Sequence, residues 1–66
     1  MYSERMLKWF GYEHLPPALQ LVSRPFGDLA KNLCEHLMPG PERTVMLRKL
    51  LEAKDAAVRA MVQPGG

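Results

Sequence analysis

Residues 41–60 read PERTVMLRKLLEAKDAAVRA, and this stretch decides the fold. Its apolar residues recur every three or four positions, which predicts an α-helix. These residues form two sides of the helix: Leu47, Leu51 and Val58 on one, and Met46, Leu50, Ala53 and Ala57 on the other. One partner helix cannot cover both sides. The stretch therefore predicts a homo-oligomer, in which any ligand site is shared between subunits.

Proline and glycine mark where the helices begin and end. Pro41 suits the first position of a helix, so we expect one helix over 41–62 and a disordered tail over 63–66. Residues 38–40 form the turn before it, and a second helix is expected over 16–38. Because the connection is short, the two should be antiparallel. A short helix over 3–10 completes a single all-α hairpin domain spanning residues 1–66.

The expected helix over 16–38 carries one strong apolar stripe. Residues spaced by three and four form it: Leu15, Leu19, Val22, Phe26, Leu29, Leu33 and Leu37. A weaker apolar side holds Ala18, Leu21, Pro25, Ala30, Cys34 and Met38. A proline inside a helix removes a hydrogen bond and clashes with the preceding turn. We expect Pro25 either to kink the helix near residues 21–24, which opens space beside Arg24, or only to bend it around the core.

The N-terminal segment is predicted to dock. Met6, Trp9 and Phe10 fall on one side of the helix expected over 3–10. Two helical turns are not stable alone in water, so this face must pack on the chain's own hairpin or on a neighbouring subunit. The residues expected at an oligomer interface are Met6, Trp9, Phe10, Leu47, Leu51 and Val58.

Size and composition favour association as the source of stability. A single core in a chain of 66 residues supplies only about 3–5 kcal/mol without help. The one cysteine, Cys34, cannot form an intrachain disulfide, which fits a reducing cytoplasm. Cys34, His14 and His36 are too few and badly spaced for a zinc site. Oligomerisation is the remaining source of stability.

The charge and hydropathy patterns exclude some classes of binding partner. The formal net charge is +2, with acids and bases interspersed and no basic stripe, so no duplex nucleic acid is expected as a partner. No apolar run approaches the roughly 20 residues of a membrane span, and the start of the chain lacks the order of a signal peptide. A small anionic ligand is compatible with this balance.

Catalysis is not expected. Cys34 and His36 are two positions apart on one helix, so they point in different directions and cannot form a nucleophile–base pair. The carboxylates lie in solvated rows beside cations, and the glycines form no phosphate-binding loop. We expect neither enzymatic activity nor a cofactor or metal.

Three polar residues are candidates for ligand binding. Tyr12, just outside the aromatic helix, can stack its ring on a nucleobase, or it can be an edge residue of the core. Arg24 can donate two hydrogen bonds to a phosphate. His14 can stack on a ligand or bond to it, or it can be an exposed linker residue.

Several short motifs resemble one family. These are Phe10-Gly11-Tyr12, Leu29-Ala30, and 41–44 leading into 47–53. From Phe10 to about Met61 the chain resembles the small phage helical-hairpin proteins that sequester cyclic nucleotides. These are the anti-CBASS sponges, whose hairpin domain is shared with the anti-Thoeris sponges.

The resemblance implies dimers that assemble to a hexamer, in the cytoplasm of a bacterial host. It implies that a cyclic di- or trinucleotide messenger is bound without cleavage, so that immunity is blocked. The family's pocket tyrosine falls on Tyr12. Its basic position falls on Ser23 or Arg24, of which only Arg24 is charged. A trinucleotide pocket between subunits has Thr44 and Arg48 as candidates. The alternative function is a helical adaptor that binds another protein through Trp9 and Phe10.

Overall fold

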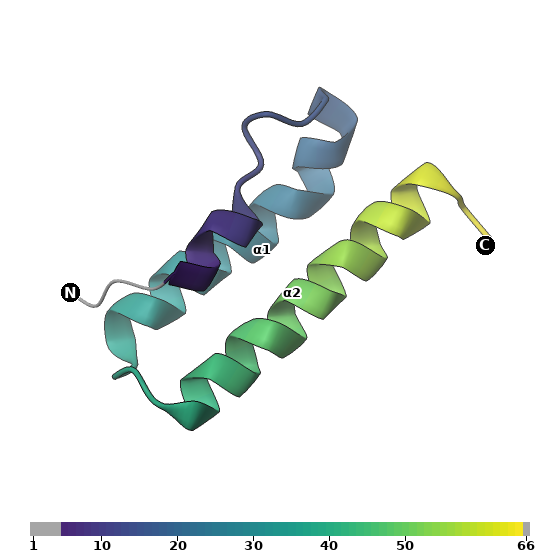
Figure 1. Ribbon diagram of the computed structural model, residues 1–66. Coiled ribbons are helices and arrows are strands. Elements are labelled where there is room, and N and C mark those ends of the chain that lie inside the picture. Colours follow the sequence, from purple (N-terminus) through teal and green to yellow (C-terminus); the bar gives the residue numbers. More distant parts are fainter. Residues whose placement is uncertain (1–4, 66) are drawn as a thin grey trace.

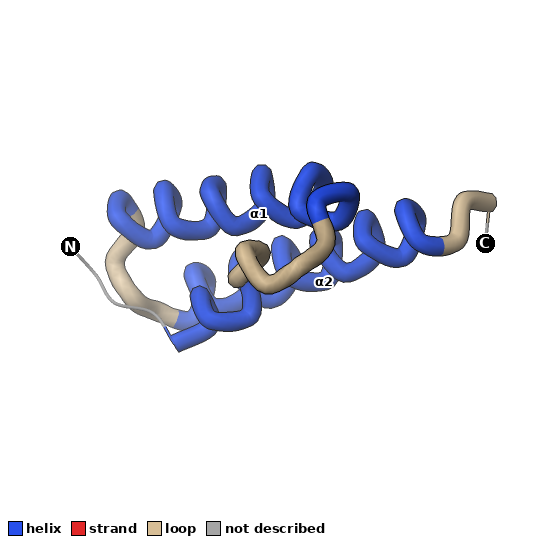
Figure 2. Tube along the Cα trace, turned by 90° about the horizontal axis from the view of Figure 1, so that it is seen from above, coloured by secondary structure: helices blue, strands red, loops and turns tan. Residues whose placement is uncertain are grey.

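The computed structural model describes residues 5–65 and is all-helical over that range (Figure 1). A 3₁₀ helix, η1, spans Arg5–Phe10, and two α-helices follow, α1 over Pro17–His36 and α2 over Pro41–Val62. The two long helices pack antiparallel as a hairpin, as the short connection predicts, and η1 lies on one face of it (Figure 1, Figure 2). The start of the helix expected over 3–10, and Gly66 of the expected tail, lie outside the described residues.

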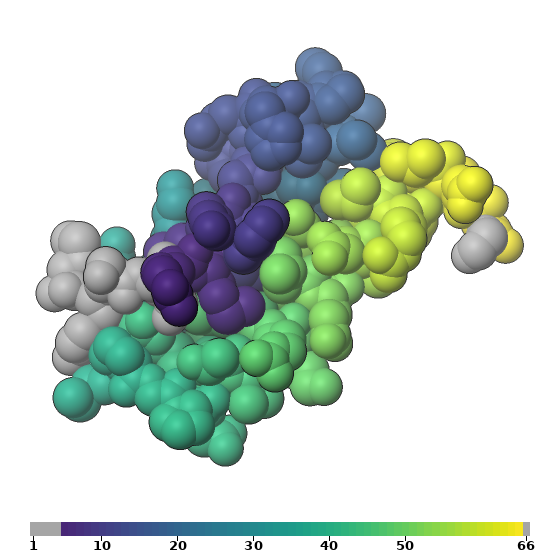
Figure 3. All heavy atoms as spheres, viewed as in Figure 1, coloured from purple at the N-terminus to yellow at the C-terminus, as the bar shows by residue number. Residues whose placement is uncertain are grey.

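η1 is a 3₁₀ helix rather than the start of an ordinary α-helix. Short helical pieces at the ends of domains often take this tighter form. Tertiary contacts hold η1 in place, because Phe10 at its end is buried and the Lys54 side chain bonds to Trp9. Figure 3 shows η1 beside the middle of α2. Of the two docking surfaces expected for this segment, the structure shows the chain's own hairpin.

α1 begins one residue later and ends two residues earlier than expected. Pro17 takes the first position, where its missing N–H has no partner to lose. After His36 the backbone is extended at Leu37, with φ −110° and ψ 131°. The residue before a proline avoids the helical region, so Met38 cannot continue α1 into Pro39. The helix is continuous through Pro25.

α2 has the bounds that the sequence predicts. Gly40 precedes it, and Pro41 and Glu42 occupy its first turn. The Thr44 hydroxyl and backbone N–H both donate to the Gly40 carbonyl, at 3.2 and 3.1 Å. At the other end the Gln63 N–H donates to the Arg59 carbonyl at 2.8 Å, which closes the last turn. A turn with Gly65 at a φ of 81° follows.

The core follows a different stripe of α1 from the one expected. The fully buried apolar residues are Phe10, Ala30, Cys34 and Leu47. On α1 the buried positions are the small residues Ser23, Gly27, Ala30 and Cys34. Of the large residues of the expected stripe, Leu29 is 46% exposed and Leu37 is 40% exposed. The others, Leu15, Leu19, Val22, Phe26 and Leu33, are half-buried.

Close approach of η1 explains why the small residues face inward. A Cβ on Gly27 would lie 2.8 Å from the carbonyl oxygen of Phe10, closer than real Cβ contacts. Only a residue without a side chain lets the end of η1 reach α1 there. The large residues of α1 consequently flank this contact instead of forming its centre.

α2 is covered from two directions within one chain. Both α1 and η1 contact it, so Leu47 is fully buried, and Met46, Leu50 and Leu51 are half-buried. Large apolar side chains remain exposed on every helix and at the turn. They are Trp9 on η1, Leu21 and Leu29 on α1, Leu37 and Met38 at the hairpin turn, and Val45, Met61 and Val62 on α2. Oligomerisation stays a prediction, and both long helices carry apolar surface available for it.

Candidate functional site

Tyr12 and Arg24, separated by twelve positions in the sequence, come together beside α1. The Arg24 guanidinium carbon lies 6.0 Å from the centroid of the Tyr12 ring. The same cluster contains Asp28: the Tyr12 hydroxyl donates to its Oδ1 at 3.4 Å, and Arg24 Nε lies 3.6 Å from its Oδ2. Arg24 and Asp28 are one helical turn apart, which places them side by side on α1.

The loop after η1 positions the tyrosine. The Leu15 N–H donates to the Tyr12 carbonyl at 3.0 Å, forming a turn that leads into α1. The Tyr12 ring packs on Gly27, whose added Cβ would lie 3.2 Å from Tyr12 Cδ2. Tyr12 is half-buried by this contact. It is thus an edge residue of the core and, through its polar end, a member of the cluster.

The sequence predicted no role for Asp28, which it placed in a solvated row. Its spacing of four from Arg24 is the signal that identifies the pair. The two side chains are 67% and 56% exposed, so their attraction is screened by water. Exposed pairs of this kind contribute about 0–1 kcal/mol. A phosphate can therefore replace the Asp28 carboxylate on Arg24 at little cost.

A surface hollow of about 480 Å³ adjoins Arg24. Its walls are polar at Gln20, Arg24 and Asp28 and apolar at Pro17, Leu21 and Pro25. All six residues belong to α1, so the hollow lies on one side of a single helix and has no opposite wall within the chain. Its volume is in the range of small-molecule sites. The hollow adjoins Arg24 and Pro25 on a helix that is continuous through Pro25.

His14 is not part of this cluster. It lines a second cavity, of about 510 Å³, on the side of the loop that faces η1 and the C-terminal half of α2. Trp9, Lys54 and Arg59 line the same cavity. None of these three was predicted as a ligand contact. Their sequence positions are too far apart to suggest a common site, since it is the docking of η1 that brings Trp9 to α2.

The remaining predicted ligand residues lie at the other end of the molecule. Thr44 is in the first turn of α2, where its hydroxyl is bonded to Gly40. Arg48 is exposed one turn later. Neither residue lines the hollow beside Arg24 or the cavity beside Trp9. A single chain thus brings Tyr12 and Arg24 together but keeps Thr44 and Arg48 apart from them.

The residues expected at a subunit interface differ in what one chain already covers. Phe10 is 2% exposed and Leu47 is fully buried, so their burial requires no second subunit. Met6 and Leu51 pack against the same core and are half-buried. Val58 is half-buried and lines the cavity beside Trp9. Trp9, at 57% exposed, is the member of this set with most surface left for a partner.

The groups with chemical reactivity are placed apart. Cys34 is a buried cysteine of the core, and His36 lies exposed with Nδ1 2.8 Å from the Asn32 carbonyl oxygen. Residues 5–65 contain no cluster of three or more His, Cys, Asp or Glu side chains that could share a metal ion. Over the same range, no helix has the length and apolarity that a membrane span requires.

Searches of protein-family models, of curated protein sequences and of solved structures found no match to this chain. A function is therefore assigned from the sequence and from the geometry of the hollow beside Arg24 and the cavity beside Trp9.

Proposed function

We propose that this protein binds and sequesters a cyclic nucleotide second messenger without cleaving it, as a phage anti-defence protein that blocks CBASS-type immunity. The observation that supports the proposal best is the pairing of Tyr12 with Arg24, which itself lines the open hollow on α1. An aromatic ring and a guanidinium group about 6.0 Å apart match the two recognisable parts of a nucleotide, its base and its phosphate.

The chemistry of each group fits that ligand. Stacking of a nucleobase on an aromatic side chain contributes about 1–3 kcal/mol. A guanidinium donates two parallel hydrogen bonds to phosphate oxygens. In the free protein the Asp28 carboxylate is paired with Arg24. This exposed ion pair is weak enough for a phosphate to displace the carboxylate. Leu21 and Pro25 offer an apolar wall for the remainder of the ligand.

The one-sided hollow also favours a shared site. Its lining comes from α1 alone, and Leu21 beside it is 74% exposed. A second subunit packed on this side of α1 would cover Leu21 and supply the missing wall. Dimers assembling to a hexamer would place several such sites in one particle. A cyclic dinucleotide is the first ligand to test, and a cyclic trinucleotide is the second.

The proposal is binding without turnover, and it assigns Tyr12 and Arg24 to binding alone. Neither Cys34, which is buried in the core, nor His36 lines the hollow. His14, Thr44 and Arg48 remain candidates for further ligand contacts.

Calorimetric titration against cyclic dinucleotides, cyclic trinucleotides and cyclic ADP-ribose isomers tests the proposal. Tyr12→Ala should weaken binding about tenfold to a hundredfold, whereas Tyr12→Phe should retain most of it if stacking dominates. Arg24→Ala should weaken binding, and Arg24→Lys should restore it only in part. Lys31→Ala removes an exposed cation from α1 away from the hollow and is the matched control.

Three results test sequestration against the other outcomes. The bound ligand should be released intact when the protein is denatured, as mass spectrometry of the released fraction would show. Unchanged affinity in both alanine variants would remove this site. Binding of none of the ligands would favour the adaptor instead.

The adaptor remains a second candidate because Trp9 is exposed. The face proposed for it is smaller than the sequence suggested, since Phe10 is buried in the chain's own core. An adaptor would bind its protein partner with Trp9 at the centre, and Trp9→Ala would abolish that binding without changing the cyclic dinucleotide titration.

A further inference from the structure

The cavity beside Trp9 has the features of a second ligand site, separate from the hollow on α1. Four parts of the chain meet around its volume of about 510 Å³: η1, the following loop, Ser23 of α1, and the C-terminal half of α2. Tyr12 and Arg24 do not line it. Small-molecule sites in proteins typically enclose about 300–1,000 Å³. The cavity is therefore large enough for a ligand of the size of a mononucleotide.

Its charge favours a dianion. The cations are Lys8 from η1 and Lys54 and Arg59 from α2, and Asp55 is the one carboxylate among the lining residues. Lys54 Nζ lies 3.4 Å from Asp55 Oδ1, so this pair is neutral as a unit, and Lys8 and Arg59 leave a formal charge of +2. A phosphomonoester carries about −1.5 to −2 charges at pH 7. Lysine and arginine are the side chains that bind such groups most strongly.

The cavity also has an aromatic wall. Trp9 is 57% exposed, although the neighbouring Phe10 is buried. The Lys8 ammonium lies 5.0 Å from the Trp9 ring centroid, so a cation and a ring surface are presented together at the rim. The Lys54 ammonium donates to the Trp9 carbonyl at 2.9 Å and holds this residue against α2. An exposed, anchored indole suits stacking by a planar ring.

Ser23 supplies an independent sign that the site is incomplete. This residue is fully buried and lines the cavity, and its Oγ has no hydrogen-bond partner. Buried hydroxyl groups are normally bonded, because leaving one without a partner costs free energy. A polar atom of a ligand bound in the cavity would satisfy this hydroxyl.

We infer that the cavity binds a small phosphomonoester that carries a planar ring, of the nucleoside monophosphate class, independently of the cyclic nucleotide site. The phosphate is held by Arg59, Lys54 and Lys8, the ring stacks on Trp9, and a polar edge of the ligand bonds to Ser23.

Trp9 is the only tryptophan of the chain, so its fluorescence reports directly on this cavity. AMP is the probe. Adenosine, which lacks the phosphate, and inorganic phosphate, which lacks the planar ring, are the controls. AMP should change the emission and should bind at least about tenfold more tightly than either control. Arg59→Gln should weaken AMP binding about tenfold or more. Lys49→Gln makes the same charge change at an exposed position of α2 outside the cavity and should leave AMP binding unchanged.

Ser23→Ala separates a ligand contact from a structural role. It should weaken AMP binding about threefold to tenfold without lowering the melting temperature, since it removes a hydroxyl that has no partner in the free protein. A lower melting temperature with unchanged AMP affinity would show that the hydroxyl is structural and would overturn its assignment.

Other outcomes overturn the whole inference. They are equal affinity for AMP and inorganic phosphate, or AMP binding that Arg24→Ala abolishes and Arg59→Gln does not affect. The second result would place AMP at the cyclic nucleotide site. Conversely, a wild-type protein that binds AMP but none of the cyclic nucleotides would refute the proposed function and leave this inference standing.

Discussion

The carbonyl oxygen of Phe10 lies so close to Gly27 that a Cβ at position 27 would be only 2.8 Å from it. Glycine inside a helix normally costs about 0.5–1 kcal/mol relative to alanine. Here the close approach of η1 to α1 reverses that preference. The docking of the N-terminal segment, and with it the position of Tyr12, rests on this contact.

Gly27→Ala should therefore lower the free energy of unfolding, by about 1–3 kcal/mol, since the backbone must shift to relieve the contact. Urea denaturation followed by circular dichroism measures the change. Gly11→Ala is the matched control, because its nearest neighbour would lie 3.6 Å away, an ordinary van der Waals distance. If Gly27→Ala is as stable as Gly11→Ala, the contact does not hold η1 in place.

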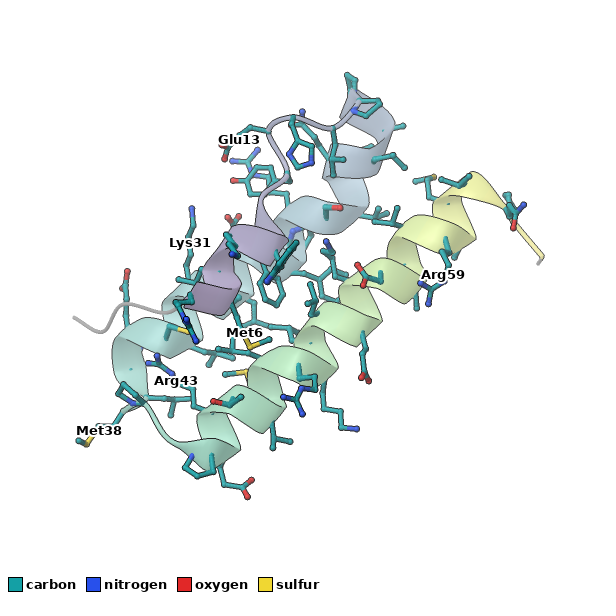
Figure 4. All side chains as sticks on the ribbon, in the orientation of Figure 1. Met6, Glu13, Lys31, Met38, Arg43 and Arg59 are labelled. Atoms are coloured by element: carbon teal, nitrogen blue, oxygen red, sulfur yellow. The ribbon has the colours of Figure 1, made fainter. Side chains whose placement is uncertain are left out.

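Arg43 should be important for stability although it carries a charge. It is buried, and its Nη1 donates to the carbonyls of Leu37 at 2.8 Å and Cys34 at 3.2 Å. The side chain extends from α2 to the C-terminal end of α1, where such carbonyls otherwise lack partners (Figure 4). Arg43→Met should cost about 1–3 kcal/mol in denaturant titration.

Arg43→Lys should recover only part of that loss, because an ammonium cannot reproduce the planar donor geometry of the guanidinium. The control is Arg48→Met, an exposed position on the same helix, where the change should stay within about 0.5 kcal/mol. Equal effects of the methionine substitutions at 43 and 48 would contradict the capping role.

Asp28→Asn should strengthen cyclic nucleotide binding. The Asp28 carboxylate competes with a phosphate for Arg24, and removing its charge frees the guanidinium. The expected gain is about two- to fivefold, the size of an exposed ion pair, and it should be largest at low salt. Calorimetry of this variant beside Glu35→Gln, another exposed acid of α1, measures it. Weaker binding in Asp28→Asn alone would mean that the carboxylate itself contacts the ligand.

We expect the protein to associate at micromolar concentration through the exposed side of α1. Leu21 and Met38 are exposed to nearly the same extent, 74% and 73%, but lie on α1 and at the hairpin turn respectively. Leu21→Glu should reduce the particle mass in light scattering while the helix content is kept. Met38→Glu should leave the mass unchanged. A wild-type mass of 7.5 kDa would refute association altogether.

The sequence alone determined the helical segments and their order. α2 has the predicted bounds because its start depends on local features, a glycine and a proline at positions 40 and 41. α1 differs from its prediction by only one or two residues, for the same reason. The antiparallel hairpin follows from the short connection between two long amphipathic helices.

The sequence also identified part of the proposed site. Tyr12 and Arg24 were chosen for their chemistry, and the structure places them 6.0 Å apart. The spacing of four residues pairs Asp28 with Arg24, but its hydrogen bond with Tyr12 depends on how the loop after η1 packs on α1, which the sequence does not show. The cavity beside Trp9 was missed for a similar reason, since its walls come from four separated parts of the chain.

Which face of α1 forms the core was decided only by the tertiary structure. Hydrophobic periodicity favoured the large residues at 19, 26 and 33, whereas the buried positions are Ser23, Gly27, Ala30 and Cys34. Periodicity measures which residues gain most from leaving water. It carries no information on how closely two backbones approach, and the packing of η1 and α2 on α1 selects small residues at the contact. The same packing buries Arg43, because its position allows it to cap the end of α1.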